Sequence, residues 1–159
     1  GTAVHGALSD FINYMMKHDK KYPAKDFLID KFVHRLYRGR ETFTQQSLQR
    51  FTEHGKNVLS AYHDKYYNPS PTGEFIVTEY PLTKITLQHI PLKGFIDKIQ
   101  FYGSDIIVTD FKTGSSTKAK QRGEFDKPGT DKKPNGGNYW RQAVFYNILI
   151  NHLPDKNWF

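Results

Sequence analysis

Apolar and polar residues alternate with the period of an α-helix through the first third of the chain. Apolar positions recur every three or four residues over 2–18, 24–38 and 42–66, which is the spacing that buries one stripe of a helix. Residues 68–73, Asn-Pro-Ser-Pro-Thr-Gly, have a composition typical of a break between elements. The pattern therefore predicts three helices before this break. A further amphipathic helix is predicted over 139–152.

Four segments between these helices are rich in β-branched and aromatic residues. They cover 74–81, 84–91, 94–102 and 105–112, with lengths and compositions typical of β-strands. Gly103-Ser104 is short enough to join the last two as a hairpin. Residues 113–138 lack such a pattern and predict a long loop, which in a small domain is usually functional or disordered. The order of elements predicts an α/β fold in which a helix covers an antiparallel part of the sheet.

Acidic and basic side chains interrupt the last two predicted strands. Alternation places Asp97 with Phe95, Ile99 and Phe101 on a face that is expected to cover a core. An unpaired buried carboxylate costs several kcal/mol, so this aspartate requires a partner such as a metal ion.

The next predicted strand carries Asp110 and Lys112 on one face. Carboxylates are the ligands that Mg²⁺ prefers, and a neighbouring ammonium stabilises charge on a phosphate during its hydrolysis. The pattern therefore predicts a metal-dependent site that cleaves phosphodiesters. The alternative is a salt-bridged Asp97 and a solvated strand end at Asp110 and Lys112.

Four short motifs resemble those of the PD-(D/E)xK nuclease superfamily, and more narrowly those of RecB-like nuclease domains at the C-termini of helicase-nucleases. In chain order they are Gly1-Thr2-Ala3-Val4-His5, Gly94-Phe95-Ile96-Asp97, Asp110-Phe111-Lys112-Thr113-Gly114 and Gln142-Ala143-Val144-Phe145-Tyr146. The resemblance implies a restriction-endonuclease-like α/β core, with a mixed β-sheet flanked by helices and a helical N-terminal elaboration.

The same resemblance implies a metal site. His5, Asp97 and Asp110 would bind Mg²⁺ or Mn²⁺ together with the backbone carbonyl of Phe111. Imidazole suits Mn²⁺ better than Mg²⁺, and a histidine on a helix is otherwise most often a surface or core residue. Glu79 is expected either beside these ligands or in a cross-strand ion pair.

The resemblance further assigns catalysis to Asp97, Asp110 and Lys112. Gln142 and Tyr146 would support the site and the DNA. Because they stand four residues apart, they share one face of a helix.

The predicted loop is rich in basic residues. From 118 to 133 it holds six basic and three acidic side chains. Lys118, Lys120 and Arg122 are expected to contact a DNA backbone, or else to lie on a solvated, mobile segment. Arg141, next to Tyr139 and Trp140, is expected to contact phosphate at the start of the last helix, where the aromatic rings could stack on bases.

Length and composition limit the class of protein. A chain of 159 residues predicts a single domain over 1–159, and a net charge of +7 favours a polyanionic partner. The lack of cysteine excludes disulfides and cysteine-bound zinc or iron–sulfur clusters. No apolar run reaches ~18 residues and no signal peptide is apparent, so a cytoplasmic, membrane-free location is expected.

These observations predict a metal-dependent deoxyribonuclease, expected to be an exonuclease that acts in DNA repair or recombination. Its DNA substrate would be single-stranded or unwound. A motif at residue 1 suggests a fragment of a longer helicase-nuclease, and without a phosphate-binding Gly-Lys-Ser/Thr motif the helicase motor must lie elsewhere. Two alternatives are a non-catalytic DNA-binding module with this fold and a structural or protein-interaction domain. The intact Asp97, Asp110 and Lys112 favour catalysis over the first alternative.

Overall fold

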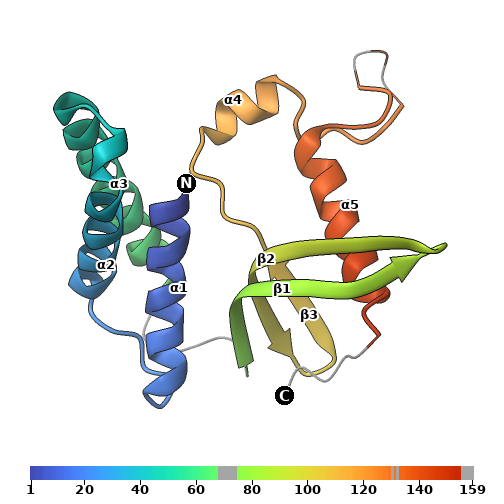
Figure 1. Cartoon of the computed structure of the whole chain (residues 1–159), viewed down its shortest axis with the longest axis horizontal. Helices are drawn as coiled ribbons and strands as arrows, with labels where there is room; N and C mark the ends of the chain where they lie inside the picture. Colours follow the sequence, from blue (N-terminus) through green and yellow to red (C-terminus); the bar gives the residue numbers. More distant parts are fainter. Residues whose placement is uncertain (68–74, 130, 132, 155–159) are drawn as a thin grey trace. The chain divides into compact units, whose positions relative to one another are not determined.

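Three helices precede a three-stranded sheet and two further helices in the computed structural model, which describes residues 1–67, 75–129, 131 and 133–154. In chain order the elements are α1 (Thr2–Lys17), α2 (Lys25–Arg38), a short 3₁₀ helix (Arg40–Thr42), α3 (Gln45–Tyr66), β1 (Phe75–Leu87), β2 (Ile90–Tyr102), β3 (Asp105–Thr109), α4 (Ser116–Gln121) and α5 (Asn138–Asn151) (Figure 1). The break predicted at 68–73 lies outside the described residues. Within the described ranges, no helix has the length and apolar character needed to cross a membrane.

The four helices predicted from the apolar period are confirmed, with ends that move by a few residues. The largest shift is at α3, which begins at Gln45 because Thr44 caps it. The side chain of Thr44 accepts a hydrogen bond from the N–H of Ser47 at 3.2 Å, which satisfies one of the free donors of the first turn.

The sheet has the order β1-β2-β3. Strands β2 and β3 pair antiparallel, with Lys98 opposite Thr109 and Tyr102 opposite Asp105. A two-residue turn at Gln88 and His89 joins β1 to β2, so this pair is also antiparallel. The fold is therefore α/β and is consistent with a restriction-endonuclease-like core. The sheet of the described residues is antiparallel, whereas a mixed sheet was expected.

The strand boundaries differ from the prediction in two places. Separate strands were expected over 74–81 and 84–91, but β1 runs unbroken from Phe75 to Leu87. The turn falls at Gln88 and His89, and β2 already begins at Ile90. Both turn residues adopt the left-handed conformation, with φ of 47° and 65°. This is the conformation a two-residue hairpin needs, yet neither residue is the Asn or Gly that usually signals it.

The second difference concerns the end of β3. This strand stops at Thr109 rather than at residue 112. The alternation of side chains along the strand therefore does not extend to Asp110 and Lys112, and the prediction that these two share a strand face is wrong.

The chain divides into two compact units. The first contains residues 1–79 and 97–111, and the second contains residues 80–96 and 112–159. Strands β1 and β2 each contribute residues to both units. The chain passes from one unit to the other between Ile96 and Asp97, and again between Phe111 and Lys112.

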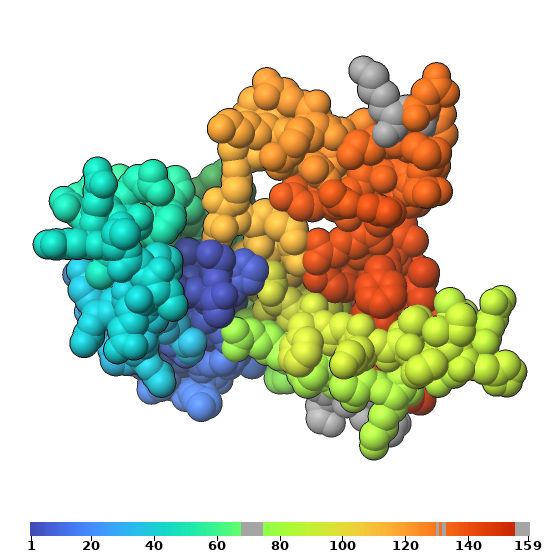
Figure 2. Space-filling model, turned by 45° about the horizontal axis from the view of Figure 1, so that its top comes forward, coloured from blue at the N-terminus to red at the C-terminus, as the bar shows by residue number. Residues whose placement is uncertain are grey.

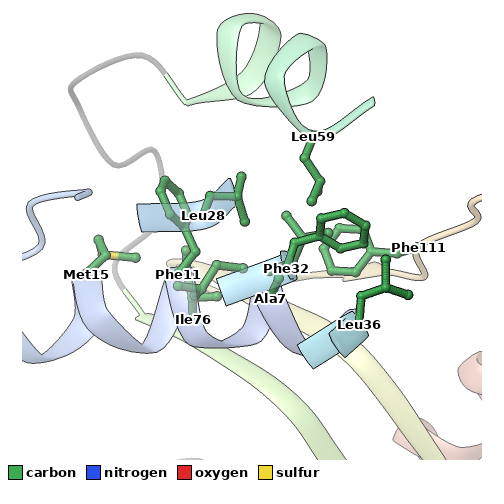
Figure 3. Close-up of a cluster of buried hydrophobic side chains, with 11 residues drawn as sticks. Ala7, Phe11, Met15, Leu28, Phe32, Leu36, Leu59, Ile76 and Phe111 are labelled. Carbon is green, nitrogen blue, oxygen red and sulfur yellow. The ribbon is translucent and has the colours of Figure 1, made fainter. Parts of the chain in front are cut away.

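The first unit is held together by apolar side chains from its three helices. Figure 3 shows this cluster, in which Phe111 lies among side chains of α1, α2 and α3. Its labelled members are Ala7, Phe11, Met15, Leu28, Phe32, Leu36, Leu59, Ile76 and Phe111. Burial of a phenylalanine side chain contributes roughly 1.5–3 kcal/mol. The residue between Asp110 and Lys112 is thus anchored in the helical core.

Polar contacts fix α1 within the first unit. The buried Oγ of Ser9 lies 2.8 Å from Oγ1 of Thr78 in β1. On another side of α1, Arg35 of α2 donates two hydrogen bonds of 2.8 Å to the carboxylate of Asp10. Bidentate pairs of this kind fix orientation as well as distance, so they set the position of the helix that carries His5.

In the second unit, α5 lies close to the hairpin of β1 and β2 (Figure 1). A Cβ atom on Gly94 of β2 would lie 2.6 Å from Cδ1 of Leu149 of α5. Ile96 and Leu149 are fully buried, whereas Phe95 is 68% exposed. The expectation that Phe95 covers a core is therefore wrong, and its neighbour Ile96 is buried instead.

We expect Gly55→Ala to destabilise the chain. A Cβ atom at Gly55 of α3 would lie 2.1 Å from Cζ of Phe32, and overpacking of this kind costs typically about 1–3 kcal/mol. At an open helix position the same substitution would instead stabilise by up to about 1 kcal/mol. Chemical denaturation measures the difference, and Phe32→Leu, which shortens the opposing side chain, should reduce the cost of Gly55→Ala. A stabilising Gly55→Ala would contradict this packing.

Candidate active site

Asp97 connects β2 to the segment that follows β3. Its Oδ2 accepts a hydrogen bond of 2.7 Å from the backbone N–H of Phe111. Its Oδ1 lies 3.2 Å from Nδ1 of His5, a hydrogen bond when that nitrogen carries the proton. The side chain of Asp97 is 19% exposed, so the carboxylate is mostly buried but has partners on both oxygens.

The ring of Phe111 links the residues around Asp97. It meets the His5 ring edge-on, with 6.0 Å between the ring centres. On the α3 side it meets Tyr62 in the same manner, with the ring centres 6.1 Å apart. The side chain of His5 stays 28% exposed. The His5 imidazole therefore packs against an apolar ring, lies beside the Asp97 carboxylate and remains accessible to solvent.

Asp110 stands one residue beyond β3. Thr109, the residue before it, is the last that pairs with β2, where it lies opposite Lys98. Oδ2 of Asp110 is buried, and no described residue donates a hydrogen bond to that oxygen, although the residue takes part in other interactions.

The predicted ligands do not form a complete metal site on their own. Within the part of the chain that the structure describes, no three His, Asp or Glu side chains form a group able to hold an ion. His5 and Asp97 are brought into contact, and Asp110 precedes the residue whose N–H binds Asp97. The donor chemistry, one imidazole and two carboxylates, suits Mn²⁺ or Mg²⁺.

Lys112 belongs to the second unit, where it contacts α5. Its Nζ donates a hydrogen bond of 2.8 Å to Oε1 of Gln142, and Nε2 of Gln142 donates one of 2.8 Å to the hydroxyl of Tyr146. The same Nζ lies 5.1 Å from the centre of the Tyr139 ring. The prediction that Gln142 and Tyr146 share a helix face is confirmed, and that face contacts the lysine.

The segment 113–138 is not the structureless loop that was expected. It contains α4, whose first turn is capped by Oγ of Ser115 accepting from the N–H of Lys118 at 3.3 Å. In the space-filling view of Figure 2, this orange segment meets the orange-red start of α5.

Glu124 connects α4 to α5 by hydrogen bonds. Its side chain accepts from the N–H of Asn138 at 3.2 Å, and its backbone oxygen accepts from Tyr139 at 2.9 Å and Trp140 at 3.1 Å. Its own N–H donates to the carbonyl of Ala119 at 3.0 Å. Glu124 is 9% exposed. It therefore satisfies the free N–H groups with which α5 begins.

The basic residues predicted to contact DNA are exposed, and they point in different directions. Lys118 and Lys120 stand two apart in α4, so they do not face the same side of that helix. Nε of Arg122 lies 3.6 Å from Oε1 of Glu124. Nη2 of Arg141 donates a hydrogen bond to Oδ1 of Asn138.

Charged neighbours of the site show two shifts of pKa. The hydrogen bonds that Arg35 donates to Asp10 raise the pKa of Arg35, and the charge of Glu79 adds to this effect. Glu79 itself is exposed and has a left-handed φ of 49°, and it acts on Arg35 of α2. Burial lowers the pKa of Lys98, which follows Asp97 in β2.

Two residues around Lys112 were not identified from the sequence. Glu124 and Phe125 lie in the segment predicted as a loop, where the sequence shows neither the apolar period of a helix nor that of a strand. The Ser115-Ser116-Thr117 run before Lys118 is a helix-start signal that could have revealed α4. Nothing in the sequence indicates that the acid at 124 binds the start of α5.

Comparison with known proteins supplies one match. A family profile described as the PD-(D/E)XK nuclease superfamily matches residues 1–157. No curated protein and no solved structure matches the chain.

We expect Glu124→Ala to loosen the start of α5. The substitution leaves the N–H of Asn138 without its acceptor, and losing such a partner costs about 1–3 kcal/mol. Chemical denaturation should show this loss, and amide hydrogen exchange should be faster at Asn138. Glu124→Gln keeps a carbonyl acceptor and is the matched control, with a smaller effect expected. Equal stability and exchange in Glu124→Ala and the unmodified chain would contradict the role of this carboxylate.

Proposed function

The chain belongs to the PD-(D/E)XK nuclease superfamily, and from this membership we propose that it is a metal-dependent deoxyribonuclease. The observation that carries the proposal is the contact of His5 and Asp97, with Asp97 also bound to the N–H of Phe111. A solvent-accessible imidazole lies beside a carboxylate, and that carboxylate binds the residue between Asp110 and Lys112. These groups offer the chemistry that phosphodiester hydrolysis needs.

In this proposal His5, Asp97, Asp110 and the carbonyl of Phe111 hold Mn²⁺ or Mg²⁺. When bound, the ion would lower the pKa of a water ligand and would act as a Lewis acid toward the phosphate oxygens. The chain contributes the arrangement of ligands. The burial of Phe111 restrains its backbone, and the hydrogen bond to Asp97 holds one carboxylate beside it.

Lys112 has the role of stabilising negative charge on the phosphate. Its ammonium donates to Gln142, which in turn donates to Tyr146. The carbonyl of the amide group therefore faces the lysine, and this orientation restrains the ammonium. Restraint before the reaction is what makes such a charge effective in the transition state.

The substrate of the proposal is DNA. A net charge of +7 attracts a polyanion. Exposed Lys118, Lys120 and Arg141 can neutralise backbone phosphates outside the site of cleavage. Arg122 is a further candidate, since its side chain is largely exposed beside Glu124.

The motif order supports a narrower assignment to RecB-like nuclease domains. We propose that the chain is a single nuclease domain of a longer helicase-nuclease, that it degrades single-stranded or unwound DNA from an end, and that it acts in repair or recombination. A helicase motor in the same or a partner chain would supply the unwound strand. We propose a cytoplasmic location together with this substrate.

Cleavage of end-labelled single-stranded DNA tests the proposal. In Mn²⁺ or Mg²⁺ the unmodified chain should cut the strand, and it should not cut in EDTA. Lys112→Ala should reduce the rate by about 10²–10³-fold, the usual cost of removing one group that stabilises transition-state charge. Asp110→Ala should abolish metal-dependent cutting because a ligand is lost.

Lys17→Ala, at the exposed end of α1, is the matched control for the loss of a positive charge and should cut normally. Full metal-dependent cleavage by Asp110→Ala would overturn the proposal. DNA binding without any cleavage would favour the alternative of a non-catalytic module with the nuclease fold.

A further inference from the structure

Phe125 is a large apolar side chain that the proposed reaction does not use. It is 50% exposed, although it lies in a segment tightly bonded to its surroundings. Single exposed hydrophobic residues are common. Phe125 requires more explanation because hydrogen bonds hold the backbone on both sides of it and its segment is rich in Lys and Arg.

The backbone on both sides of Phe125 is fixed. The N–H of Glu124 donates to Ala119 at 3.0 Å, and the N–H of Asp126 donates to Gly123 at 3.2 Å. The carbonyl of Asp126 accepts from the N–H of Gly137 at 2.9 Å. The aromatic ring is therefore presented by a restrained backbone, which lowers the entropy cost of binding anything to it.

A line of contacts connects Phe125 to the proposed catalytic lysine. Its ring packs on Tyr139 with 5.2 Å between the centres and an angle of 75° between the planes. Tyr139 in turn lies 5.1 Å from Nζ of Lys112. Tyr139 contacts both Phe125 and Lys112 and is only partly exposed, so Phe125 has the more exposed ring of the two. All three residues belong to the second unit.

The segment that carries this ring is rich in the charges that attract a nucleic acid. Between residues 112 and 141 the sequence holds eight Lys and Arg against three Asp and Glu. One of the three acids, Glu124, is buried against the start of α5. A half-exposed aromatic ring among cations is the combination by which proteins bind single strands, since phosphates meet the cations and bases stack on rings.

We propose that Phe125 is a stacking platform for an unpaired base of the strand whose phosphate lies at Lys112. The inference rests on the proposed nuclease function and adds to it a specificity-determining residue. The ring selects for strands with unstacked bases, because a base within a duplex has both faces covered by its neighbours. Each contact in the line is about 5 Å, so the base lies within a few nucleotides of that phosphate, given a rise of roughly 3.4 Å per nucleotide.

Fluorescence anisotropy without metal separates stacking from catalysis. The probes are a labelled oligothymidylate and an abasic strand of equal length, both titrated in EDTA at one fixed salt concentration. The unmodified chain should bind the oligothymidylate more tightly than the abasic strand. Phe125→Ala should weaken binding of oligothymidylate by roughly 5- to 150-fold, the range that stacking of one base supplies, and should leave the abasic strand unaffected.

Three further variants make the result specific. Phe125→Trp keeps a ring and should retain the preference for bases, whereas Phe125→Leu keeps apolar volume without a ring and should lose it. Phe51→Ala removes a comparably exposed phenylalanine, 40% exposed in α3, and should bind both strands as the unmodified chain does. Thermal unfolding of each variant confirms that it folds.

Equal binding of both strands by the unmodified chain, or no binding of either, would overturn the inference. Binding by Phe125→Leu equal to that of the unmodified chain would do the same, because a side chain without a ring would then suffice. The proposed function fails separately. If Asp110→Ala cuts DNA normally, the catalytic assignment is wrong even where Phe125 is needed for binding, and if Phe125 is dispensable while Asp110 is essential, only this inference fails.

Discussion

The anchoring of Phe111 is the interaction on which the candidate site depends. Its side chain is buried among α1, α2 and α3, and its N–H binds Asp97. Asp110 and Lys112 stand on either side of it in the chain. A buried apolar side chain thus restrains the backbone between the residues proposed to bind the metal and the phosphate.

The same arrangement explains why the two groups of polar contacts are separate. His5 and Asp97 meet in the first unit, and Lys112 meets Gln142 and Tyr139 in the second. The chain crosses from one unit to the other directly before Asp97 and directly after Phe111. Both motifs that carry the proposed catalytic residues therefore lie where the chain changes unit, so few residues connect the proposed metal ligands to the proposed catalytic lysine.

Sequence periodicity was sufficient for α1, α2 and α3, because their apolar stripes pack in one core. It was also sufficient for the pairing of Gln142 with Tyr146, which follows from helical spacing alone. The strand ends were harder to predict. A Gln-His turn carries no glycine or asparagine signal, and β3 ends where Phe111 enters the helical core, a tertiary effect that β-propensity does not contain. The role of Glu124 could not be predicted either, since a buried acid in a polar segment is distinguished only by the N–H groups that it meets.

The central claim is that Asp110 binds the metal while Lys112 acts on the phosphate. Isothermal titration of Mn²⁺ into the unmodified chain, Asp110→Ala and Lys112→Ala tests this division directly, without any substrate. The account predicts that Lys112→Ala binds Mn²⁺ as tightly as the unmodified chain or more tightly, because a positive charge has been removed, and that Asp110→Ala loses the binding. Equal Mn²⁺ affinity in Asp110→Ala and the unmodified chain would contradict the account.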